Sequence, residues 1–188
     1  MTRPSPTKPP AAPALRSRSM TTPIGPLELV AGPAGLRAVL WPGEDGSRVA
    51  LTAAVARAGT GAGWDSADLL QAEHHLDAAQ AQLEQYFAGT RRTFDLDLDP
   101  VGTDFQLRAW NALRTIPYGQ TLSYGEQATE IGAPGAARAV GAANGRNPLS
   151  IVVPCHRVVA ASGALTGFAG GLDTKAWLLD HERTLAGR

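Results

Sequence analysis

Cysteine is nearly absent from this chain, since Cys155 is the only one among 188 residues. A single cysteine excludes a disulfide within the chain. With only four histidines, scattered along the sequence, a structural zinc site is not expected either. We therefore expect no metal and no cofactor. The lone thiol is instead a candidate for chemistry.

Long apolar runs are also missing. No stretch approaches the roughly 20 residues of a membrane-spanning helix, and the first twenty residues lack the apolar centre of a secretion signal. These absences predict a cytoplasmic protein with no membrane partner. Hydrophobic residues still make up 44% of the chain, which is enough for the core of one domain or two small ones.

An excess of charge of one sign is absent too, because the formal net charge is zero at pH 7. This excludes a uniformly basic nucleic-acid-binding protein, but the charges are unevenly distributed. Residues 21–100 hold five bases against eleven acids, whereas residues 101–188 hold eight against six. The C-terminal half could therefore still meet DNA phosphates through one face.

Residues 1–19 are rich in proline and poor in large apolar groups, which predicts a disordered arm. Residues 20–100 are predicted to form a small α/β domain, a small sheet plus a helix. Its expected elements are hairpin strands over 27–30 and 36–41, a helix over 69–87 and a third strand over 93–98.

Residues 101–188 are predicted to be mainly helical. Thr103 and Ser123 each begin a capping box, which marks the start of a helix. After a break at 132–135, residues 136–143 form a further helix, so that two short helices around a glycine turn make a helix-turn-helix candidate. The second of these helices carries almost no bulk except Arg138. It is suited to press against a DNA groove or, as an equal alternative, against another helix.

Cys155 follows the apolar run 149–153, which we interpret as a buried strand. At an unperturbed pKa of about 8.5 the thiol needs a base. His156 is adjacent, but neighbours on an extended chain point to opposite faces, so a turn or a bridging water is required. Glu182, on a last helix expected to be capped by Asp173 or Thr174, is the acid that would hold the imidazole. An inert buried cysteine is the alternative.

The motif Pro154-Cys155-His156-Arg157-Val158 lies in a wider pattern. It follows Asn147-Pro148 and the AARAVG segment over 136–141, and it precedes Gly170-Gly171 and Trp177-Leu178-Leu179. Together these motifs resemble the O6-alkylguanine-DNA alkyltransferases, also called methylated-DNA-protein-cysteine methyltransferases. The resemblance runs from about Phe105 to Glu182, and the N-terminal half is similar to the small α/β domain of that family.

The resemblance implies repair of O6-alkylguanine in double-stranded DNA by irreversible transfer of the alkyl group to Cys155, once per molecule. It implies that His156 activates the thiol through water with Glu182 behind it. Tyr124 would act as general acid on the base, and Asn147 would brace the active-site turn. This interpretation requires a cavity beside the thiol that can admit a purine.

The resemblance also implies how DNA is bound. Arg138 would fill the space left by the flipped base, with its helix in the minor groove. The further DNA-binding residues are Ala136, Ala137, Ala139 and Gly141, and the expected pocket residues are Val158, Phe168, Ala169 and Gly170. Phe168-Ala169 replaces the tyrosine and serine of some relatives, which removes a hydroxyl but keeps the backbone N–H. The zinc-ligating cysteines of some animal members are absent.

Two other classes of function fit parts of the pattern. A hydrolase using Cys155, His156 and Glu182 would turn over many times without needing a helix-turn-helix. A non-catalytic helix-turn-helix protein would bind DNA and be indifferent to Cys155. For the alkyltransferase we expect a monomer in solution, with cooperative assembly on DNA as a further option.

Overall fold

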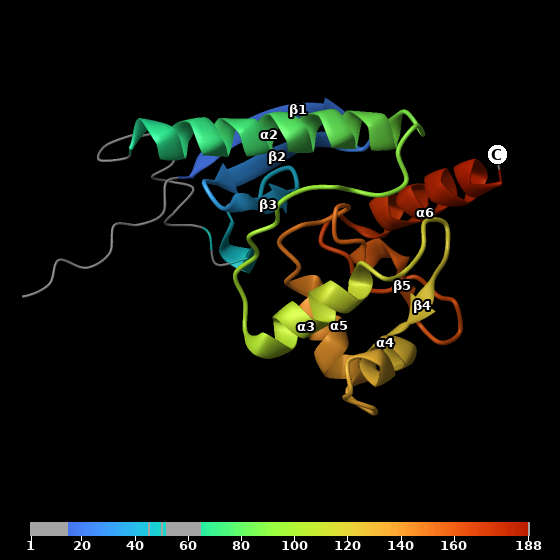
Figure 1. Cartoon of the computed structure of the whole chain (residues 1–188). Coiled ribbons are helices and arrows are strands. Elements are labelled where there is room, and N and C mark those ends of the chain that lie inside the picture. The colour runs from blue at the N-terminus through green and yellow to red at the C-terminus, as the bar shows by residue number, and fades with distance from the viewer. Residues whose placement is uncertain (1–14, 45, 50, 52–64, 188) are drawn as a thin grey trace, which may run out of the picture.

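The computed structural model describes residues 15–44, 46–49, 51 and 65–187. Within them a three-stranded antiparallel sheet is followed by a long helix and then by a mainly helical C-terminal part (Figure 1). This confirms the predicted fold class. In the described part of the chain no helix combines the length and apolar character needed to cross a bilayer.

The sheet has the order β1 (Arg16–Thr22), β2 (Gly25–Gly32) and β3 (Gly35–Leu40). Strands β2 and β3 are the predicted hairpin. Strand β1 corrects the prediction of an arm over residues 1–19, because residues 16–19 pair with β2. The composition of residues 16–19 does not indicate this strand, because the strand is stabilised by backbone pairing with β2 and by the side chain of Arg18. That side chain binds Glu73 at 2.8 Å and Asp77 at 2.6 Å. Residues 1–14 lie outside the described residues.

Helix α2 (Ser66–Phe87) confirms the predicted helix and runs along the sheet (Figure 1). It begins at Asp65, whose side chain accepts a hydrogen bond from the backbone N–H of Ala67 at 3.1 Å. Its buried side follows the helical repeat, and its fully buried residues include Leu76, Leu83 and Tyr86. These side chains join those of the sheet in the main core.

The predicted third strand over 93–98 is wrong. The segment is extended, but only Leu98 makes an isolated bridge, to Leu36. The reason is a side chain: Gln82 of α2 accepts from the backbone N–H of Asp95 at 2.8 Å and donates to its carbonyl at 2.7 Å. The amide of Gln82 thus takes both backbone hydrogen bonds of Asp95. Pairing with β3 is limited to the end of the segment, where Leu36 bonds to Asp97 and Asp99.

The C-terminal part begins with α3 (Asp104–Leu113), and both predicted capping boxes, at Thr103 and Ser123, are present. The remaining elements are η1 (Ser47–Val49), β4 (Leu122–Ser123), α4 (Tyr124–Glu130), α5 (Ala137–Gly145), η2 (Cys155–Arg157), β5 (Val158–Val159) and α6 (Leu172–Ala186). Helices α4 and α5 pack together around the turn between them, and α5 also packs on α3. Strands β4 and β5 form a short parallel pair.

Two expectations in this part are corrected. The run 149–153 is a tight loop and not a strand, with Ile151 at a φ of 73°. The Asn147 side chain closes this loop by donating to the Val153 carbonyl at 2.8 Å and accepting from the Leu149 N–H at 3.0 Å. Helix α6 begins after Gly171, whose φ of 87° turns the chain into the helix without a side-chain cap, so neither of the predicted caps is used.

Candidate active site around Cys155

Cys155 is the first residue of the 3-10 turn η2, so a turn and not a strand end presents the thiol. The residue is 7% exposed. Burial raises the pKa of the thiol, opposed by the hydrogen bond to Asn147 and by the charges of Lys175 and Arg48. A thiol with a raised pKa is protonated at neutral pH, so attack by this sulfur requires a proton acceptor.

His156, the next residue, is completely buried. Its Nε2 lies 2.8 Å from Oε1 of Glu182, and its Nδ1 has no hydrogen-bond partner among the described residues. Burial lowers the pKa of His156, and this effect of burial is larger than the opposing effect of Glu182. Because a carboxylate only accepts, Nε2 carries the single proton of the neutral ring, and Nδ1 is left with a lone pair. This tautomer can act as a base.

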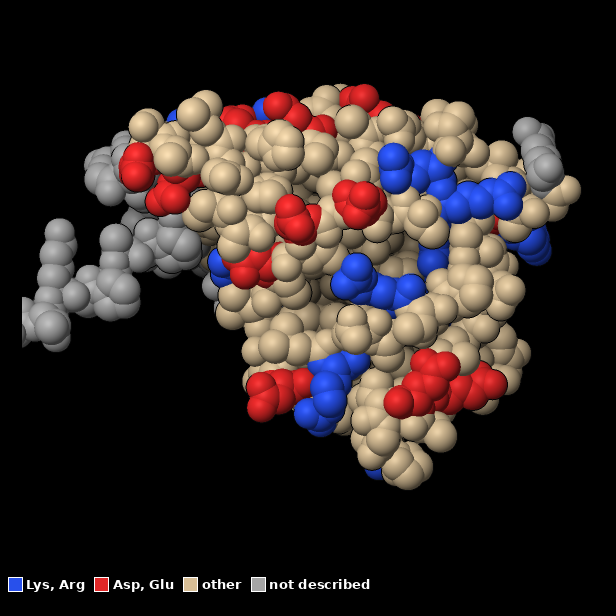
Figure 2. Space-filling model, viewed as in Figure 1, with Lys and Arg blue, Asp and Glu red and all other residues tan. Residues whose placement is uncertain are grey.

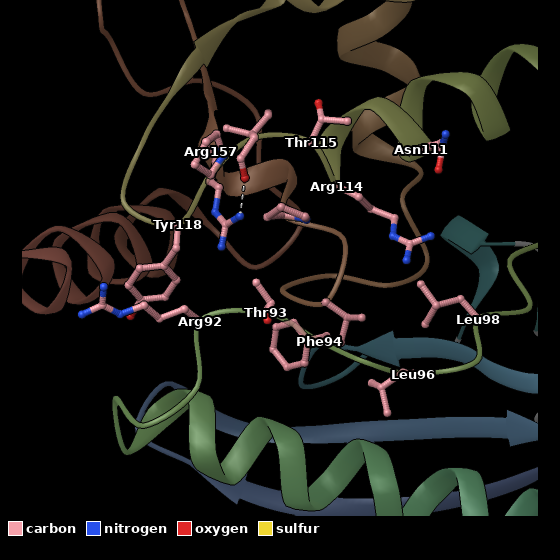
Figure 3. A pocket seen from close by; sticks show the side chains of 14 residues that line it. Arg92, Thr93, Phe94, Leu96, Leu98, Asn111, Arg114, Thr115, Tyr118 and Arg157 are labelled. Carbon is pink, nitrogen blue, oxygen red and sulfur yellow. Dashed lines mark hydrogen bonds between the residues drawn. The ribbon is translucent and has the colours of Figure 1, made fainter.

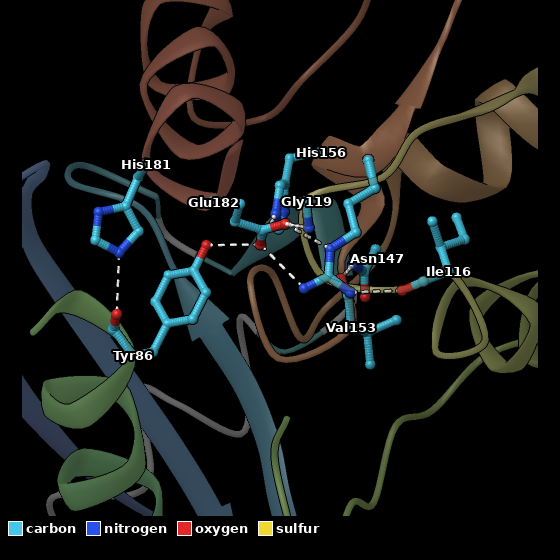
Figure 4. Close-up of polar contacts among 9 residues, drawn as sticks. Tyr86, Ile116, Gly119, Asn147, Val153, His156, His181 and Glu182 are labelled. Atoms are coloured by element: carbon cyan, nitrogen blue, oxygen red, sulfur yellow. Dashed lines mark hydrogen bonds and ion pairs between the residues drawn. The ribbon is translucent and has the colours of Figure 1, made fainter. Parts of the chain in front are cut away.

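Glu182 of α6 is also completely buried, and several donors share its carboxylate (Figure 4). Tyr86 donates its hydroxyl to Oε1 at 2.9 Å, Arg157 donates Nε to Oε2 at 2.9 Å, and the N–H of Gly119 reaches Oε2 at 3.0 Å. Burial by itself would raise the pKa of Glu182, but the bonds from His156 and Arg157 hold it well below the usual range. The carboxylate is therefore ionised and fixed in place.

Sequence reasoning missed Arg157 and Tyr86 as partners of Glu182. Arg157 stands in the quoted motif without an assigned role, and Tyr86 reads as an ordinary apolar-face residue of α2. The only available signal is chemical: a carboxylate placed in a core needs donors. Which residues provide them depends on contacts that are far apart in the chain.

Lys175 is another buried charge that the sequence analysis did not assign. It is completely buried, and its Nζ donates to the carbonyls of Val158 at 2.6 Å and Thr166 at 2.8 Å. Burial lowers the pKa of Lys175, while the nearby Cys155 raises it. The ammonium therefore ties β5 to the 166–170 loop and sets a positive charge near the thiol.

A groove of about 580 Å³ lies between α5 and the 166–169 loop. We call it the α5 groove. Its lining residues are Arg48, Tyr124, Ala137, Arg138, Gly141, Gly145, Thr166, Gly167, Phe168 and Ala169. The structure thus brings together most of the predicted DNA-binding and pocket residues.

Other predicted residues lie outside the lining of the α5 groove. Cys155 is buried in the main core, to which Tyr124 and Phe168 also pack, and it does not line the groove. Val158 is completely buried in β5. Gly170 lies against Trp41, because a Cβ at this position would be 2.8 Å from the indole. Ala136, the half-buried N-cap of α5, and Ala139, an exposed residue of that helix, also lie outside the lining.

One side of helix α5 packs against other helices and the other side is exposed. The helix can therefore contact both a neighbouring helix and a ligand, which were the two alternatives for its small residues. Val140 and Asn144 are buried, and Asn144 exchanges hydrogen bonds with Gln127 of α4 at 2.7 and 3.2 Å. Arg138 is exposed and has no hydrogen bond or ion pair with any residue that the structure describes. Its guanidinium is available to a partner.

Two residues of the N-terminal half, Arg48 and Trp41, contact residues around the site. Arg48 donates to the Asn147 carbonyl at 2.8 Å. The Trp41 indole lies with its ring centroid 5.3 Å from that of Phe168 and donates to Ser150 at 3.2 Å. None of these three contacts is visible in the sequence, because each joins residues about a hundred positions apart or more.

The fold and the site together define a class of protein. A small sheet domain is joined to a helical part, and the helical part contains a buried cysteine next to a histidine that is hydrogen-bonded to a carboxylate. One helix of the same part borders an open groove. Comparison with known families is specific. The profile of the 6-O-methylguanine DNA methyltransferase ribonuclease-like domain matches residues 15–100, and that of the DNA binding domain matches residues 104–184. The chain belongs to the 6-O-methylguanine DNA methyltransferase family.

Individual relatives agree with this family. The methylated-DNA-protein-cysteine methyltransferase of Mycobacterium leprae is 48% identical over 169 residues, covering 90% of this chain and 93% of the relative. That of Mycobacterium tuberculosis is 60% identical over 111 residues, 59% of this chain and 67% of the relative. A crystal structure of Mycobacterium tuberculosis OGT in complex with DNA has a TM-score of 0.73 and 44% identity, covering 90% of this chain and 94% of that one.

Proposed function

We propose that this protein repairs O6-alkylated guanine in double-stranded DNA by moving the alkyl group onto Cys155. The observation that carries the proposal is the buried pair of His156 and Glu182, 2.8 Å apart, next in sequence to the only thiol and with the histidine Nδ1 unpaired. A relative crystallised with DNA and the family membership support the same activity.

Activation of the thiol is the first step. His156 is held as the neutral tautomer by Glu182, and its free Nδ1 takes the proton of Cys155 through one water molecule. The buried imidazolium that forms is stabilised by the adjacent carboxylate. Lys175, whose charge lowers the pKa of the thiol, favours the thiolate at the same moment.

The substrate base occupies the α5 groove. The volume of about 580 Å³ is within the range of small-molecule sites, so it can admit an extruded purine. Phe168 covers the face of the base, and the backbone N–H of Ala169 donates to the O6 oxygen. Cys155, Val158 and Gly170 lie outside the lining of the groove in this structure. The residues between the groove and the thiol must therefore move aside when the base binds, so that the alkyl carbon contacts the sulfur for in-line attack.

Transfer is an in-line displacement. The sulfur attacks the alkyl carbon, a carbon–sulfur bond forms as the carbon–oxygen bond breaks, and the electron pair of that bond stays on the guanine. Tyr124 donates its hydroxyl proton to the guanine, which leaves neutral. The tyrosinate and the imidazolium of His156 return to neutrality by proton exchange with water. Because the thioether has no leaving group, each molecule reacts once.

DNA is held by α5 in the minor groove. Arg138 enters the duplex where the flipped base leaves the stack, and the small side chains allow the helix backbone to approach closely. The residues expected along this contact are Ala136, Ala137, Ala139 and Gly141. We place the protein in the cytoplasm, because a nucleophilic cysteine must remain a reduced thiol. We further expect it to act as a monomer.

The test is a mass measurement of the intact protein after incubation with a duplex that carries one O6-methylguanine. We expect a gain of one CH₂ per molecule, with no further turnover when more damaged duplex is added. Cys155→Ala, folded to the same extent by circular dichroism, serves as the control and should gain nothing.

Two results would contradict the proposal. An unchanged mass together with repeated release of repaired DNA would indicate a hydrolytic activity. Binding of duplex with neither repair nor mass gain, in both wild type and Cys155→Ala, would indicate a non-catalytic DNA-binding protein.

A further inference from the structure

The indole of Trp41 contacts two separate loops of the C-terminal part. Trp41 follows β3 and is only 4% exposed. Its ring centroid lies 5.3 Å from that of Phe168, edge to face, and a Cβ at Gly170 would be 2.8 Å from the indole. Its Nε1 donates to Oγ of Ser150 at 3.2 Å. One side chain of the N-terminal half thus joins the loop before α6 to the loop that leads to Cys155.

Polar contacts fix the position of Trp41. Its backbone N–H donates to Oε2 of Glu44 at 2.9 Å, and the Glu44 carboxylate binds the guanidinium of Arg48. Arg48 in turn donates to the Asn147 carbonyl at 2.8 Å. The turn that carries the indole is therefore attached to the loop that Asn147 closes. A displacement of the indole would break these contacts, so Trp41 is a firm support for whatever packs on it.

Open space borders the loop that leads to Cys155. A hollow of about 310 Å³ lies between the segment that connects α2 to α3 and the C-terminal part, and Val152 and Pro154 belong to its lining (Figure 3). Figure 2 shows a hollow near the middle of the viewed face, with basic side chains beside it. Close packing alone therefore does not hold this loop in place. The hydrogen bond from Trp41 to Ser150 restrains a segment that has room to move.

The role of Trp41 rests on the proposed function, in which O6 accepts a hydrogen bond from Ala169 and the alkyl carbon contacts the sulfur of Cys155. The alkyl group then lies between the two loops that the indole holds. Phe168 flanks this space, because its ring centroid is 6.5 Å from that of His156. A methyl group ends at the reacting carbon, whereas a benzyl group extends beyond it by a whole ring. Room for that ring depends on how far the two loops can separate.

We propose that Trp41 is a specificity-determining residue that limits the size of the alkyl group. The indole holds the two loops at a separation that suits a methyl group and restricts larger groups such as benzyl. A smaller side chain at position 41 would let Phe168 and Gly170 retreat from the substrate and would release Ser150. Benzyl transfer would then gain more than methyl transfer, because only the larger group needs the added space.

The experiment is a competition between two damaged duplexes, followed by the mass of the intact protein. The full chain is mixed with an excess of both duplexes in equal amounts, one carrying O6-methylguanine and the other O6-benzylguanine at the same position of the same sequence. One spectrum gives the ratio of benzylated to methylated protein, and changes in thiol activation affect both products alike. In Trp41→Leu we expect this ratio to rise by about tenfold or more over wild type. Trp41→Phe, which keeps a smaller ring but loses the bond to Ser150, should give a smaller rise.

Trp177→Leu is the matched control, because Trp177 is a half-buried tryptophan of α6 that stacks on His181 and does not line the α5 groove. Its ratio should equal that of wild type. Trp41→Phe decides the question if Trp41→Leu does not fold by circular dichroism. A folded Trp41 variant with an unchanged or lower ratio, or an equal rise in Trp177→Leu, would overturn the role of Trp41. No mass gain from either duplex in wild type would instead contradict the proposed function itself.

Discussion

The imidazole of His156 and the carboxylate of Glu182 are joined at 2.8 Å in a place where both side chains are completely shielded from solvent. Residues 26 positions apart in the chain meet there because α6 packs against the turn η2. The pair fixes which nitrogen of the ring carries the proton. Both the stability of the fold and the reactivity of the thiol depend on it.

Replacing Glu182 by glutamine should damage stability and activity together. The variant leaves the buried guanidinium of Arg157 without a counter-ion, which costs about 3 kcal/mol or more in the free energy of unfolding. It also releases the ring of His156, so single-turnover alkyl transfer should slow by roughly 100-fold. Urea unfolding and the rate of mass gain measure the two effects. The control is Glu130→Gln, an exposed carboxylate of α4. Equal stability of the two variants would contradict the prediction.

Acid should destabilise the protein in two stages. The pKa of His156 is lowered in the folded state, so below the ordinary value of 6.5 the unfolded chain takes up a proton that the folded protein does not. The pKa of Glu182 is lowered as well, so its contribution is present above the ordinary value of 4.5 and is lost as the pH falls further. The free energy of unfolding should therefore decline below about pH 6.5, and more steeply below about pH 4.5, in urea titrations at stepped pH. A flat profile from pH 7 to 5 would argue against a neutral buried histidine.

Alkali should destabilise the protein through the thiol. The pKa of Cys155 is raised by burial, so its contribution is fully present below the ordinary value of 9.0 and is lost as the pH rises beyond it. Cys155→Ser removes this titration while keeping a small polar group. We expect the difference in unfolding free energy between wild type and Cys155→Ser to shrink above pH 9. A constant difference up to pH 10.5 would show that burial does not raise the pKa.

A methyl group at position 170 should disturb the loop that covers the α5 groove. In Gly170→Ala the added carbon would lie 2.8 Å from the indole of Trp41, so the loop or the indole must move. We expect a loss of roughly 1 to 3 kcal/mol in unfolding free energy. Alkyl transfer from a free O6-alkylguanine base should slow by roughly tenfold or more, because the pocket wall is displaced. Gly187→Ala, which meets no atom within 4 Å, is the control. Unchanged rates in Gly170→Ala would show that the loop adapts without cost.

Removal of the Arg138 side chain should separate duplex repair from chemistry. Arg138→Ala loses the side chain that we propose fills the space left by the flipped base, so repair in duplex should slow by about 100-fold, in line with an unstacking cost of a few kcal/mol. Reaction with the free alkylated base should be nearly unchanged. Arg183→Ala, an exposed arginine paired only with Asp180, is the matched control. Equal losses of rate on duplex and on free base would show that Arg138 does not fill the space left by the flipped base.

The sequence predicts best where structure is local. Capping boxes at Thr103 and Ser123 placed the starts of two helices correctly, because the cap and its partner are three residues apart. The sequence predicts structure least well where the side chain of a residue outside a segment makes hydrogen bonds with the backbone of that segment. Gln82 takes both backbone hydrogen bonds of Asp95 within the predicted strand 93–98, and Asn147 closes 149–153 into a loop. Neither effect is contained in the alternation of apolar residues.

The candidate site shows the same division. Cys155, His156 and Glu182 could be selected from the sequence because their chemistry is distinctive. Their supports could not, since Tyr86 and Lys175 look like one apolar-face aromatic and one ordinary basic residue. A buried carboxylate indicates that donors exist, but only the folded structure shows that Tyr86 of α2 and Arg157 of η2 are two of them.

Helix α5 has a consequence for how damage is searched for. Apart from Arg138, its exposed positions offer little more than methyl groups and hydrogen atoms, which can neither donate nor accept a hydrogen bond from a base edge. If α5 contacts DNA as we propose, only Arg138 on its exposed face could read a base edge. Selectivity would then rest mainly on which nucleotide leaves the stack and fits the groove.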